Sequence, residues 1–503
     1  MMTFLRGREG AWVVALAALA ALRVVLLSAA FPLFSNVDEH RHIDGVLKYA
    51  RGYLPTPDNV AYEPEMGRYL GLYGSPEFLL PAHGPGAQAP PPPPWRRSSH
   101  AMLRSIERGE AFFAHRSNLE AMQPPAYYAL AGLWLRFGRL LGLQGGELLY
   151  WVRGLGAVLL SALLIASYGF LREIYPEDAF MRLGVPALLC VFPMDVFSYV
   201  TRDALSPLVA GVGFFLALRL IDPRRPELCW NHAAVAVVMA LAFLSKYTNV
   251  ALLAACALCT AIALRLRPGA RKLHGQGGCL LAMWAFTAAT CGAWLVRNLL
   301  VFGDLTGTAY KIERMGWGRK PLALYLDHPL FTFSGVRTFF GELIPLFWRG
   351  ELAWYREPLA SPLADGVYTA TTVAFVALAA WGIARRERPR TARLAEAVAL
   401  VSVLGSVALL AGLSLPYVFH ETSNPSAQLP YFVQGRLISG ALAPFLLLYL
   451  RGIAVATSRL PTARAAATAA WVCLGAVMCV AVVSEARLHW VVFASEYNLF
   501  HLP

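Results

Sequence analysis

Apolar segments alternate with short polar loops along most of the chain. Eleven of these segments are candidate membrane spans, because about 20 apolar residues cover the hydrocarbon core of a bilayer. They lie at about 11–33, 148–171, 183–200, 204–221, 231–246, 249–266, 279–301, 366–384, 396–417, 434–451 and 465–486. The chain is also 57% hydrophobic and only 15% charged. We therefore predict an all-α polytopic membrane protein with about eleven transmembrane helices.

The net charge of +13 suggests that the protein binds nucleic acid, but the placement of the charges argues against this. Basic residues cluster in short loops between apolar segments, which is the arrangement of cytoplasmic loops beside anionic lipid. We therefore predict membrane lipid as a partner and no nucleic acid. The clustered basic residues are Arg219, Arg224, Arg225, Arg265, Arg267, Arg271, Lys272, Arg385, Arg386, Arg388, Arg390, Arg393, Arg451, Arg459 and Arg464.

The same charge placement decides whether the ambiguous apolar stretch 124–142 crosses the membrane. If the basic loops are inside, Arg202 is outside and segment 148–171 runs inward. The first segment lacks a clear cleavage site and follows two arginines, so it is an anchor that runs outward. Segment 124–142 is then already outside and cannot cross, so it should lie in the interface or re-enter. Its two interior arginines suit a surface-lying helix better than a span. We predict an inner N-terminus and an outer C-terminus.

This topology divides the chain into membrane-spanning and outer parts. The aromatic outer loop predicts amphipathic helices, which either form a lid over a lipid-facing cleft or anchor the chain in the interface. Pro90–Pro94 predicts an extended or disordered stretch. The parts are the first helix (1–33), an outer loop with an acidic motif, the proline-rich segment and the interfacial helix (34–147), helices two to seven (148–301), the aromatic outer loop (302–365), and helices eight to eleven with a short outer tail (366–503).

The eight cysteines do not suggest a metal site. Seven lie within apolar segments, and Cys229 lies in a basic loop. Cys256 and Cys259 are one helical turn apart, but no partner pair of zinc-site spacing accompanies them. We interpret the cysteines as small buried hydrophobic side chains.

Two adjacent carboxylates, Asp38 and Glu39, follow the first apolar segment directly. At the mouth of a membrane span they are costly unless water, a cation or a basic partner meets them. A carboxylate held at a membrane surface can also deprotonate a hydroxyl group. His40 and His42 lie close by, but two histidines without further ligands are a weak metal signal.

Several cations are predicted at the same outer side, at helix ends, against the positive-inside bias. Each alone is explained by a side chain that snorkels to the interface, whereas together they suit a phosphate or pyrophosphate group at membrane depth. Asp38 and Asp203 also offer ligands for a hard cation such as Mg²⁺ or Mn²⁺. The cations are Arg202, Lys246, Arg297 and Arg436, and Gln434 accompanies Arg436. A base, a phosphate site and a lipid-facing loop suit the transfer of a head group from a lipid phosphate.

The motifs at these positions resemble those of the GT-C glycosyltransferases, which are multispanning enzymes that use polyprenyl-phosphate sugars. Protein O-mannosyltransferases and lipid A aminoarabinose transferases are members. The resemblance covers about residues 10–455 and is carried by motif order and common sidedness. The similar stretches are Asp38-Glu39-His40, Gln123-Pro-Pro-Ala-Tyr-Tyr-Ala-Leu130, Arg202-Asp203-Ala-Leu205, Leu244-Ser-Lys-Tyr-Thr248, Trp294-Leu-Val-Arg-Asn298 with Gly303-Asp304, and Gln434-Gly-Arg436.

The resemblance implies a GT-C-like fold and an inverting hexosyl- or pentosyltransferase of the bacterial cytoplasmic (inner) membrane, with its active site on the periplasmic side. It implies a polyprenyl-phosphate sugar as donor and a cell-envelope glycan, lipid or protein as acceptor. Asp38 would be the general base, with Glu39 beside it. The donor phosphate would lie against Lys246, Tyr247, Arg297, Arg436, Gln434 and Arg202.

Three departures and two other classes of function accompany this interpretation. Val37 stands where proline often precedes the acidic pair, Leu437 replaces a common tyrosine, and the proline-rich insert in the first outer loop is unusual. A transporter or flippase of lipid-linked glycans would also need outer cations, but it would favour charges inside the spans. An O-antigen ligase or polymerase would need an outer loop rich in Arg and His, and His328 is the single histidine of loop 302–365.

Overall fold

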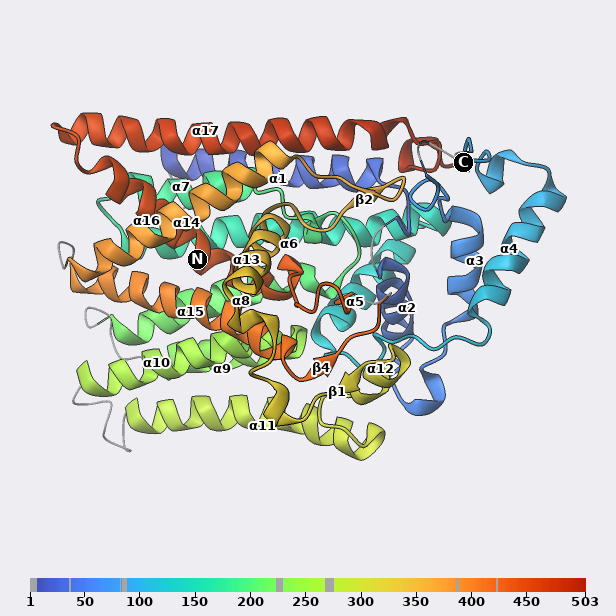
Figure 1. Cartoon of the computed structure of the whole chain (residues 1–503), viewed down its shortest axis with the longest axis horizontal. Helices are drawn as coiled ribbons and strands as arrows, with labels where there is room; N and C mark the ends of the chain where they lie inside the picture. The colour runs from blue at the N-terminus through green and yellow to red at the C-terminus, as the bar shows by residue number, and fades with distance from the viewer. Residues whose placement is uncertain are drawn as a thin grey trace.

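The computed structural model describes residues 7–35, 38–81, 83, 88–222, 229–266, 276–385, 389–421 and 424–503. Long helices run side by side along one direction and form a bundle, with α1 and α17 along one edge and α9, α10 and α11 along the other (Figure 1). Within the described residues, nine helices are long and apolar enough to cross a membrane, and α7 and α9 are shorter apolar helices. The prediction of an all-α polytopic membrane protein is confirmed.

Each of the eleven predicted segments corresponds to a helix of this bundle. Helix α16 is buried along nearly its whole length, so it lies at the centre of the core. The basic-loop residues Arg224, Arg225, Arg267, Arg271, Lys272, Arg386 and Arg388 lie outside the described residues. The helices are α1 (Arg8–Ala30), α6 (Gly145–Ile174), α7 (Ala179–Val191), α8 (Ser206–Ile221), α9 (Cys229–Ser245), α10 (Val250–Leu266), α11 (Gln276–Phe302), α14 (Pro362–Ala384), α15 (Arg390–Ser414), α16 (Leu442–Thr457) and α17 (Ala463–His489).

Two of the predicted spans are shorter as α-helices than the sequence suggested. Segment 183–200 is helical only as far as Val191, because Pro193 disfavours helical backbone at the residue before it. The chain then forms the short 3₁₀ turns η4 (Asp195–Phe197) and η5 (Arg202–Ala204). Segment 434–451 begins with the 3₁₀ helix η10 (Gly435–Ala441) before α16. Both irregular stretches lie at the candidate site.

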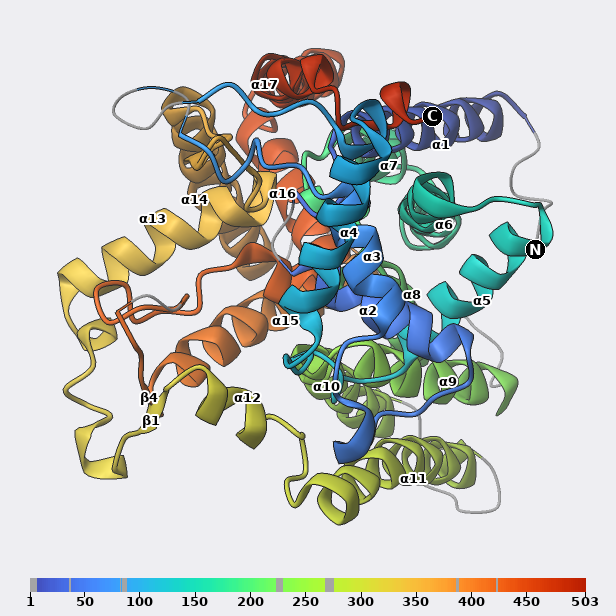
Figure 2. The same ribbon diagram turned by 90° about the vertical axis from the view of Figure 1, so that its right-hand side faces the viewer.

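The first predicted outer loop is largely folded and covers one end of the bundle (Figure 2). It forms α2 (Glu39–Ala50), α3 (Pro64–Tyr73), α4 (Ser99–Phe113) and α5 (Ala126–Leu140), with short 3₁₀ turns η2 (Pro57–Asn59) and η3 (Pro94–Arg96). Helices α2, α3 and α4 were not predicted. Helices α3 and α4 approach closely because glycines meet at their crossing: a Cβ on Gly109 would lie 2.2 Å from the backbone oxygen of Gly67.

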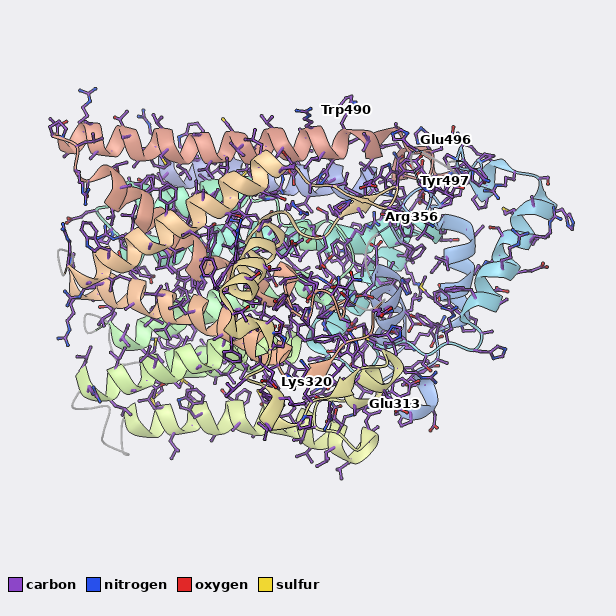
Figure 3. All side chains as sticks on the ribbon, in the orientation of Figure 1. Glu313, Lys320, Arg356, Trp490, Glu496 and Tyr497 are labelled. Carbon is purple, nitrogen blue, oxygen red and sulfur yellow. A yellow bond between two sulfur atoms is a disulfide. The ribbon has the colours of Figure 1, made fainter. Side chains whose placement is uncertain are left out.

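The proline-rich segment is extended, as predicted, and it is docked rather than disordered. The Tyr497 hydroxyl donates to the Pro91 carbonyl at 2.8 Å, and Trp95 Nε1 donates to the His501 carbonyl at 2.9 Å. Figure 3 shows Tyr497 beyond the end of α17, beside this part of the first outer loop. The C-terminal segment, which includes η11 (Trp490–Ala494) and η12 (Leu499–His501), therefore packs against residues that lie some 400 positions earlier.

The aromatic outer loop contains the amphipathic helix α13 (Phe333–Arg349) and the short helix α12 (Ala309–Arg314). It also contains the turns η8 (Leu322–Leu324) and η9 (Pro329–Phe331). Two antiparallel pairs add a little strand: β1 (Gly318–Arg319) with β4 (Tyr417–Val418), and β2 (Ala353–Trp354) with β3 (Glu357–Pro358). Buried Trp348 stacks on Tyr368 with ring centres 4.7 Å apart, which fixes α13 to the bundle.

Two further features bear on the predictions. Helix α5 has 15 residues and packs on α6, where Trp134 and Trp151 stack with ring centres 4.4 Å apart. At 1.5 Å per residue it is about 22 Å long, short of the roughly 30 Å of a hydrocarbon core. Cys229 and Cys279 form a disulfide between the starts of α9 and α11, which differs from the expectation of separate buried side chains.

Candidate functional site

Asp38 stands at the turn that leads into α2, in a backbone conformation that is unusual for its residue type. Its φ is +66°, in the left-handed region that non-glycine residues rarely adopt and that is enriched at functional sites. Asp38 Oδ1 lies 2.7 Å from Arg41 Nη1, and Asp38 Oδ2 lies 3.3 Å from Arg436 Nη2. The side chain is 17% exposed, so a second molecule can reach this carboxylate.

The charges around Asp38 keep its carboxylate ionised. Burial raises the pKa of Asp38, but the Arg436 and Arg41 guanidiniums outweigh this effect and hold the pKa below its usual value. A carboxylate with a lowered pKa is available as a proton acceptor at neutral pH.

Arg436 joins Asp38 to a second, fully buried carboxylate. Arg436 Nη1 lies 3.5 Å from Asp203 Oδ2, and Lys246 Nζ lies 2.5 Å from Asp203 Oδ1. Lys246 Nζ also donates to the Arg436 carbonyl at 2.6 Å. We call Asp38, Asp203, Lys246 and Arg436 the Arg436 cluster. Asp38 directly precedes α2, Asp203 lies in η5, Lys246 directly follows α9 and Arg436 lies in η10, so residues that the sequence predicted on one side do lie together.

Glu39 has an environment unlike that of its neighbour Asp38. Its side chain is 0% exposed, and Arg153 on α6 binds both of its carboxylate oxygens, at 2.7 and 2.6 Å. The backbone N–H groups of Val200 and Phe34 also donate to these oxygens. We expected Glu39 to be part of the catalytic pair, but its oxygens are taken up by partners that hold the acidic turn against α6 and the η4–η5 segment.

Two charged residues that the sequence did not indicate lie next to the Arg436 cluster. Buried Glu120 forms ion pairs with Arg202 at 2.9 Å and with Lys311 on α12. Burial raises the pKa of Glu120, but the charges of Lys311 and Arg202 lower it by more than burial raises it. The pKa therefore lies well below its usual value, and this carboxylate is ionised. Glu120 lies three residues before Gln123 of the Gln-Pro-Pro motif, but nothing in that motif indicates a buried carboxylate.

The aromatic outer loop also contributes an acid. Glu351, between α13 and β2, has its Oε2 2.7 Å from Arg436 Nε. Its backbone N–H donates to Asp195 Oδ2 at 2.9 Å. The loop thus supplies Lys311 and Glu351 to the site, which a surface anchor alone would not require.

Three other predicted donor-site residues have different partners. Arg297 donates to the Pro55 carbonyl and lies over the rings of Trp294 and Phe302. The Tyr247 hydroxyl accepts from Trp294 Nε1 and Asn298 Nδ2, each at 3.0 Å. Gln434 Nε2 donates to Asn424 Oδ1 at 2.9 Å, while its Oε1 is buried without a partner. We expected Arg297 to lie with the Arg436 cluster, but its hydrogen bond instead ties α11 to the first outer loop.

The side chains around Asp38 and Asp203 do not favour a divalent metal between these two carboxylates. Asp38 is already matched by two protein cations and Asp203 by three. Within the described residues, no group of three or more His, Cys, Asp or Glu side chains is arranged to hold a metal ion. His40 stacks against Tyr62 and Phe113, and His42 bonds the Tyr128 hydroxyl at 2.8 Å. The Mg²⁺ or Mn²⁺ prediction therefore lacks support in this arrangement.

Comparisons with known proteins place the chain among membrane proteins. No curated protein matches it. One similar solved structure is the oligosaccharyltransferase AglB from the archaeon Archaeoglobus fulgidus, in complex with an inhibitory peptide and a dolichol-phosphate, with a TM-score of 0.42 and 12% sequence identity. The match covers 95% of this chain and 56% of AglB, so the chain spans little more than half the length of that enzyme. Residues 21–436 match the family described as predicted membrane protein (DUF2142), and the chain belongs to that family.

Proposed function

We propose that the protein is an inverting glycosyltransferase that moves a sugar from a polyprenyl-phosphate donor to an acceptor at the outer face of the bacterial cytoplasmic membrane. The main support is the bridge that Arg436 makes between Asp38 and Asp203. Through this bridge a reachable carboxylate, Asp38, lies beside the cations Arg436 and Lys246 at one end of a membrane helix bundle. Those are the two parts that the reaction needs, a base for a hydroxyl and a site for a phosphate.

The proposed step needs one proton acceptor and one stabilised leaving group. Asp38 accepts the proton of the acceptor hydroxyl, whose oxygen bonds to the anomeric carbon of the sugar. The bond from that carbon to the phosphate oxygen breaks, and the polyprenyl phosphate leaves with the electron pair. Attack opposite the leaving group inverts the anomeric centre. Cations beside the phosphate stabilise the charge that grows on it in the transition state.

The two cations of the Arg436 cluster would have different roles. The Arg436 side chain is 14% exposed, whereas that of Lys246 is 2% exposed. Arg436 is therefore the better candidate for direct contact with the donor phosphate. Lys246 would hold Asp203 and the backbone of Arg436 in place. Lys311, which is 23% exposed and paired with Glu120, is a further candidate that the motifs did not identify.

The geometry favours this reaction over the two other classes. In a ligase or polymerase, His328 would be the natural loop base, but its Nδ1 accepts from the Leu330 N–H and its Nε2 lies 3.0 Å from the Pro430 carbonyl. In a flippase, charges inside the bundle would line a polar path. Two such charges, Arg23 and Glu485, instead pair with each other at 2.6 Å.

The test is transfer of labelled sugar by the purified protein in nanodiscs, offered a panel of hexose- and pentose-bearing polyprenyl phosphates. We expect Asp38→Asn to bind donor normally but to lose a factor of roughly 10²–10⁴ in turnover, the usual contribution of a general base. Asp327→Asn, at an exposed carboxylate of the aromatic loop, is the matched control and should keep full turnover. Near wild-type turnover in Asp38→Asn would remove Asp38 as the base.

A further inference from the structure

A cavity of about 630 Å³ lies next to the turn that holds Asp38, where Phe34, His40 and Arg41 line it. Its walls come from the start of α2, the segment around Tyr62, the end of α4 and α12. Arg41 lines the cavity and also pairs with Asp38 Oδ1, while Arg436 pairs with Oδ2. Asp38 therefore lies between the cavity and the cations proposed for the donor phosphate.

One wall of the cavity is a packed group of rings. Tyr62 and Phe113 have ring centres 4.1 Å apart, and His40 stacks against both, at 6.0 and 5.8 Å. Phe34, Phe78 and Phe112 extend this wall. The face of an aromatic ring carries partial negative charge, so it attracts the weakly positive C–H bonds of a sugar ring. Such a wall suits a carbohydrate.

The charged side chains that line the cavity are all basic. Arg41, Arg116 and Arg314 line it, and no Asp or Glu is among its described lining residues. Arg41 is matched by Asp38, but Arg116 and Arg314 form no ion pair with any residue that the structure describes. They lie instead over the rings of Phe112 and Tyr310, at 3.8 and 5.4 Å from the ring centres. Two guanidiniums without a counter-charge can bind a carboxylate or phosphate.

We propose that this cavity binds the acceptor and that the acceptor is an acidic glycan, whose anionic group is a uronate or a phosphate. The aromatic wall would hold a sugar ring, Arg116 and Arg314 would bind the anionic group, and a hydroxyl of the same glycan would point to Asp38. The role as acceptor rests on the proposed function, whereas binding of the glycan does not and can be measured without any donor.

The test is binding of defined trisaccharides to the purified full-length protein in nanodiscs by isothermal titration calorimetry. The probes are trigalacturonate, a phosphate-bearing trisaccharide, and trigalacturonate whose carboxyl groups have been reduced. We expect at least one acidic probe to bind on the order of tenfold or more tightly than the reduced one, and this preference to weaken in high salt. Which acidic probe binds identifies the anionic group.

Variants locate the site. Arg116→Gln with Arg314→Gln should lose the preference for the acidic probe and keep weak binding of the reduced one. Arg104→Gln, an exposed arginine of α4 outside the cavity, is the matched control and should bind as the wild type does. Equal binding of acidic and reduced probes, or an equal loss in Arg104→Gln, would overturn the proposal. Tight binding at this cavity by a glycan that never receives sugar, in a preparation that glycosylates other acceptors, would overturn its role as acceptor.

Discussion

Asp38 and Glu39 are neighbours in the chain, yet their surroundings suit them to different roles. Asp38 is partly exposed and faces Arg41, Arg436 and, at longer range, Glu120 and Lys311. Glu39 is fully enclosed, with both oxygens bonded to Arg153 and to backbone N–H groups. The sequence indicates an acidic pair, but only packing decides which of the two can meet a substrate.

The pH dependence of the reaction should report the charges around Asp38. Because its pKa is lowered, Asp38 stays ionised at neutral pH, and turnover should fall only as the pH drops through that lowered value. Arg41→Gln removes one of the charges that oppose the effect of burial. The pKa of Asp38 should then rise, and the acidic limb of the kcat profile should move to higher pH. An unchanged limb in Arg41→Gln would mean that another group sets it, and Arg104→Gln controls for loss of a positive charge elsewhere.

Loss of the Glu39 charge should damage stability more than chemistry. Glu39→Gln leaves Arg153 buried without a counter-charge, and breaking a buried pair in this way costs about 3–5 kcal/mol. Thermal unfolding in detergent should show a lowered midpoint for Glu39→Gln and an almost unchanged one for Asp38→Asn. The double variant Glu39→Gln/Arg153→Met should recover part of the loss. A wild-type midpoint in Glu39→Gln would contradict the structural role.

At the scale of elements, close packing on α13 explains why the Gln434-Gly435-Arg436 stretch needs its glycine. A Cβ there would lie 2.2 Å from the Cα of Phe347 and 2.3 Å from its backbone nitrogen, so η10 packs directly on the backbone of α13. Gly435→Ala should push η10 away and displace Arg436. A shift of about 1 Å can cost on the order of 10²-fold in turnover.

The matched control for this prediction is Gly341→Ala on α13, where a Cβ would meet nothing within 4 Å. Turnover and donor affinity should fall in Gly435→Ala and stay unchanged in Gly341→Ala. If both variants behave alike, contact between η10 and α13 does not position Arg436.

The long helices could be predicted from the sequence because hydrophobic length alone defines them. Two predicted spans are shorter as α-helices than the sequence suggested. Pro193 ends α7 early, and segment 434–451 begins with the 3₁₀ helix that contains Gly435. Helices α2, α3 and α4 were missed because they are polar and short, and α3 and α4 pack through glycines rather than through an apolar stripe. Such a contact depends on partners that are distant in the chain.

At the scale of the whole molecule, the candidate site was predicted only in part. Asp38, Asp203, Lys246 and Arg436 could be grouped because charge placement assigns them to one side of the membrane. Glu120, Lys311 and Glu351 could not, since each is a single charge in a loop and gains meaning only from its partner. Sidedness also does not say which neighbours a side chain meets: Arg297 contacts Pro55, Trp294 and Phe302, and its role at a donor phosphate stays a prediction.

The position of α5 relative to the membrane fixes the topology of the whole bundle. If α5 crossed the membrane, helices α6 and α7 would place Asp203 on the side opposite to Asp38, roughly 30 Å away. Arg436 lies within 3.5 Å of both carboxylates, which favours an α5 that does not cross. Single cysteines in a background without native cysteines can test this in intact cells with a membrane-impermeant maleimide.

Cysteines at Gln144, Lys320 and Glu496 should react from outside, and cysteines at Glu177 and Ser458 only after the membrane is opened. Lys320 and Glu496 are labelled in Figure 3, and Glu496 is a better probe than buried Ser495. Positions 270 and 388, which we also expect inside, lie outside the described residues. Because Gln144 directly follows α5, its labelling only after opening would mean that α5 crosses. The common side of Asp38 and Asp203, and the proposed reaction with it, would then fail together.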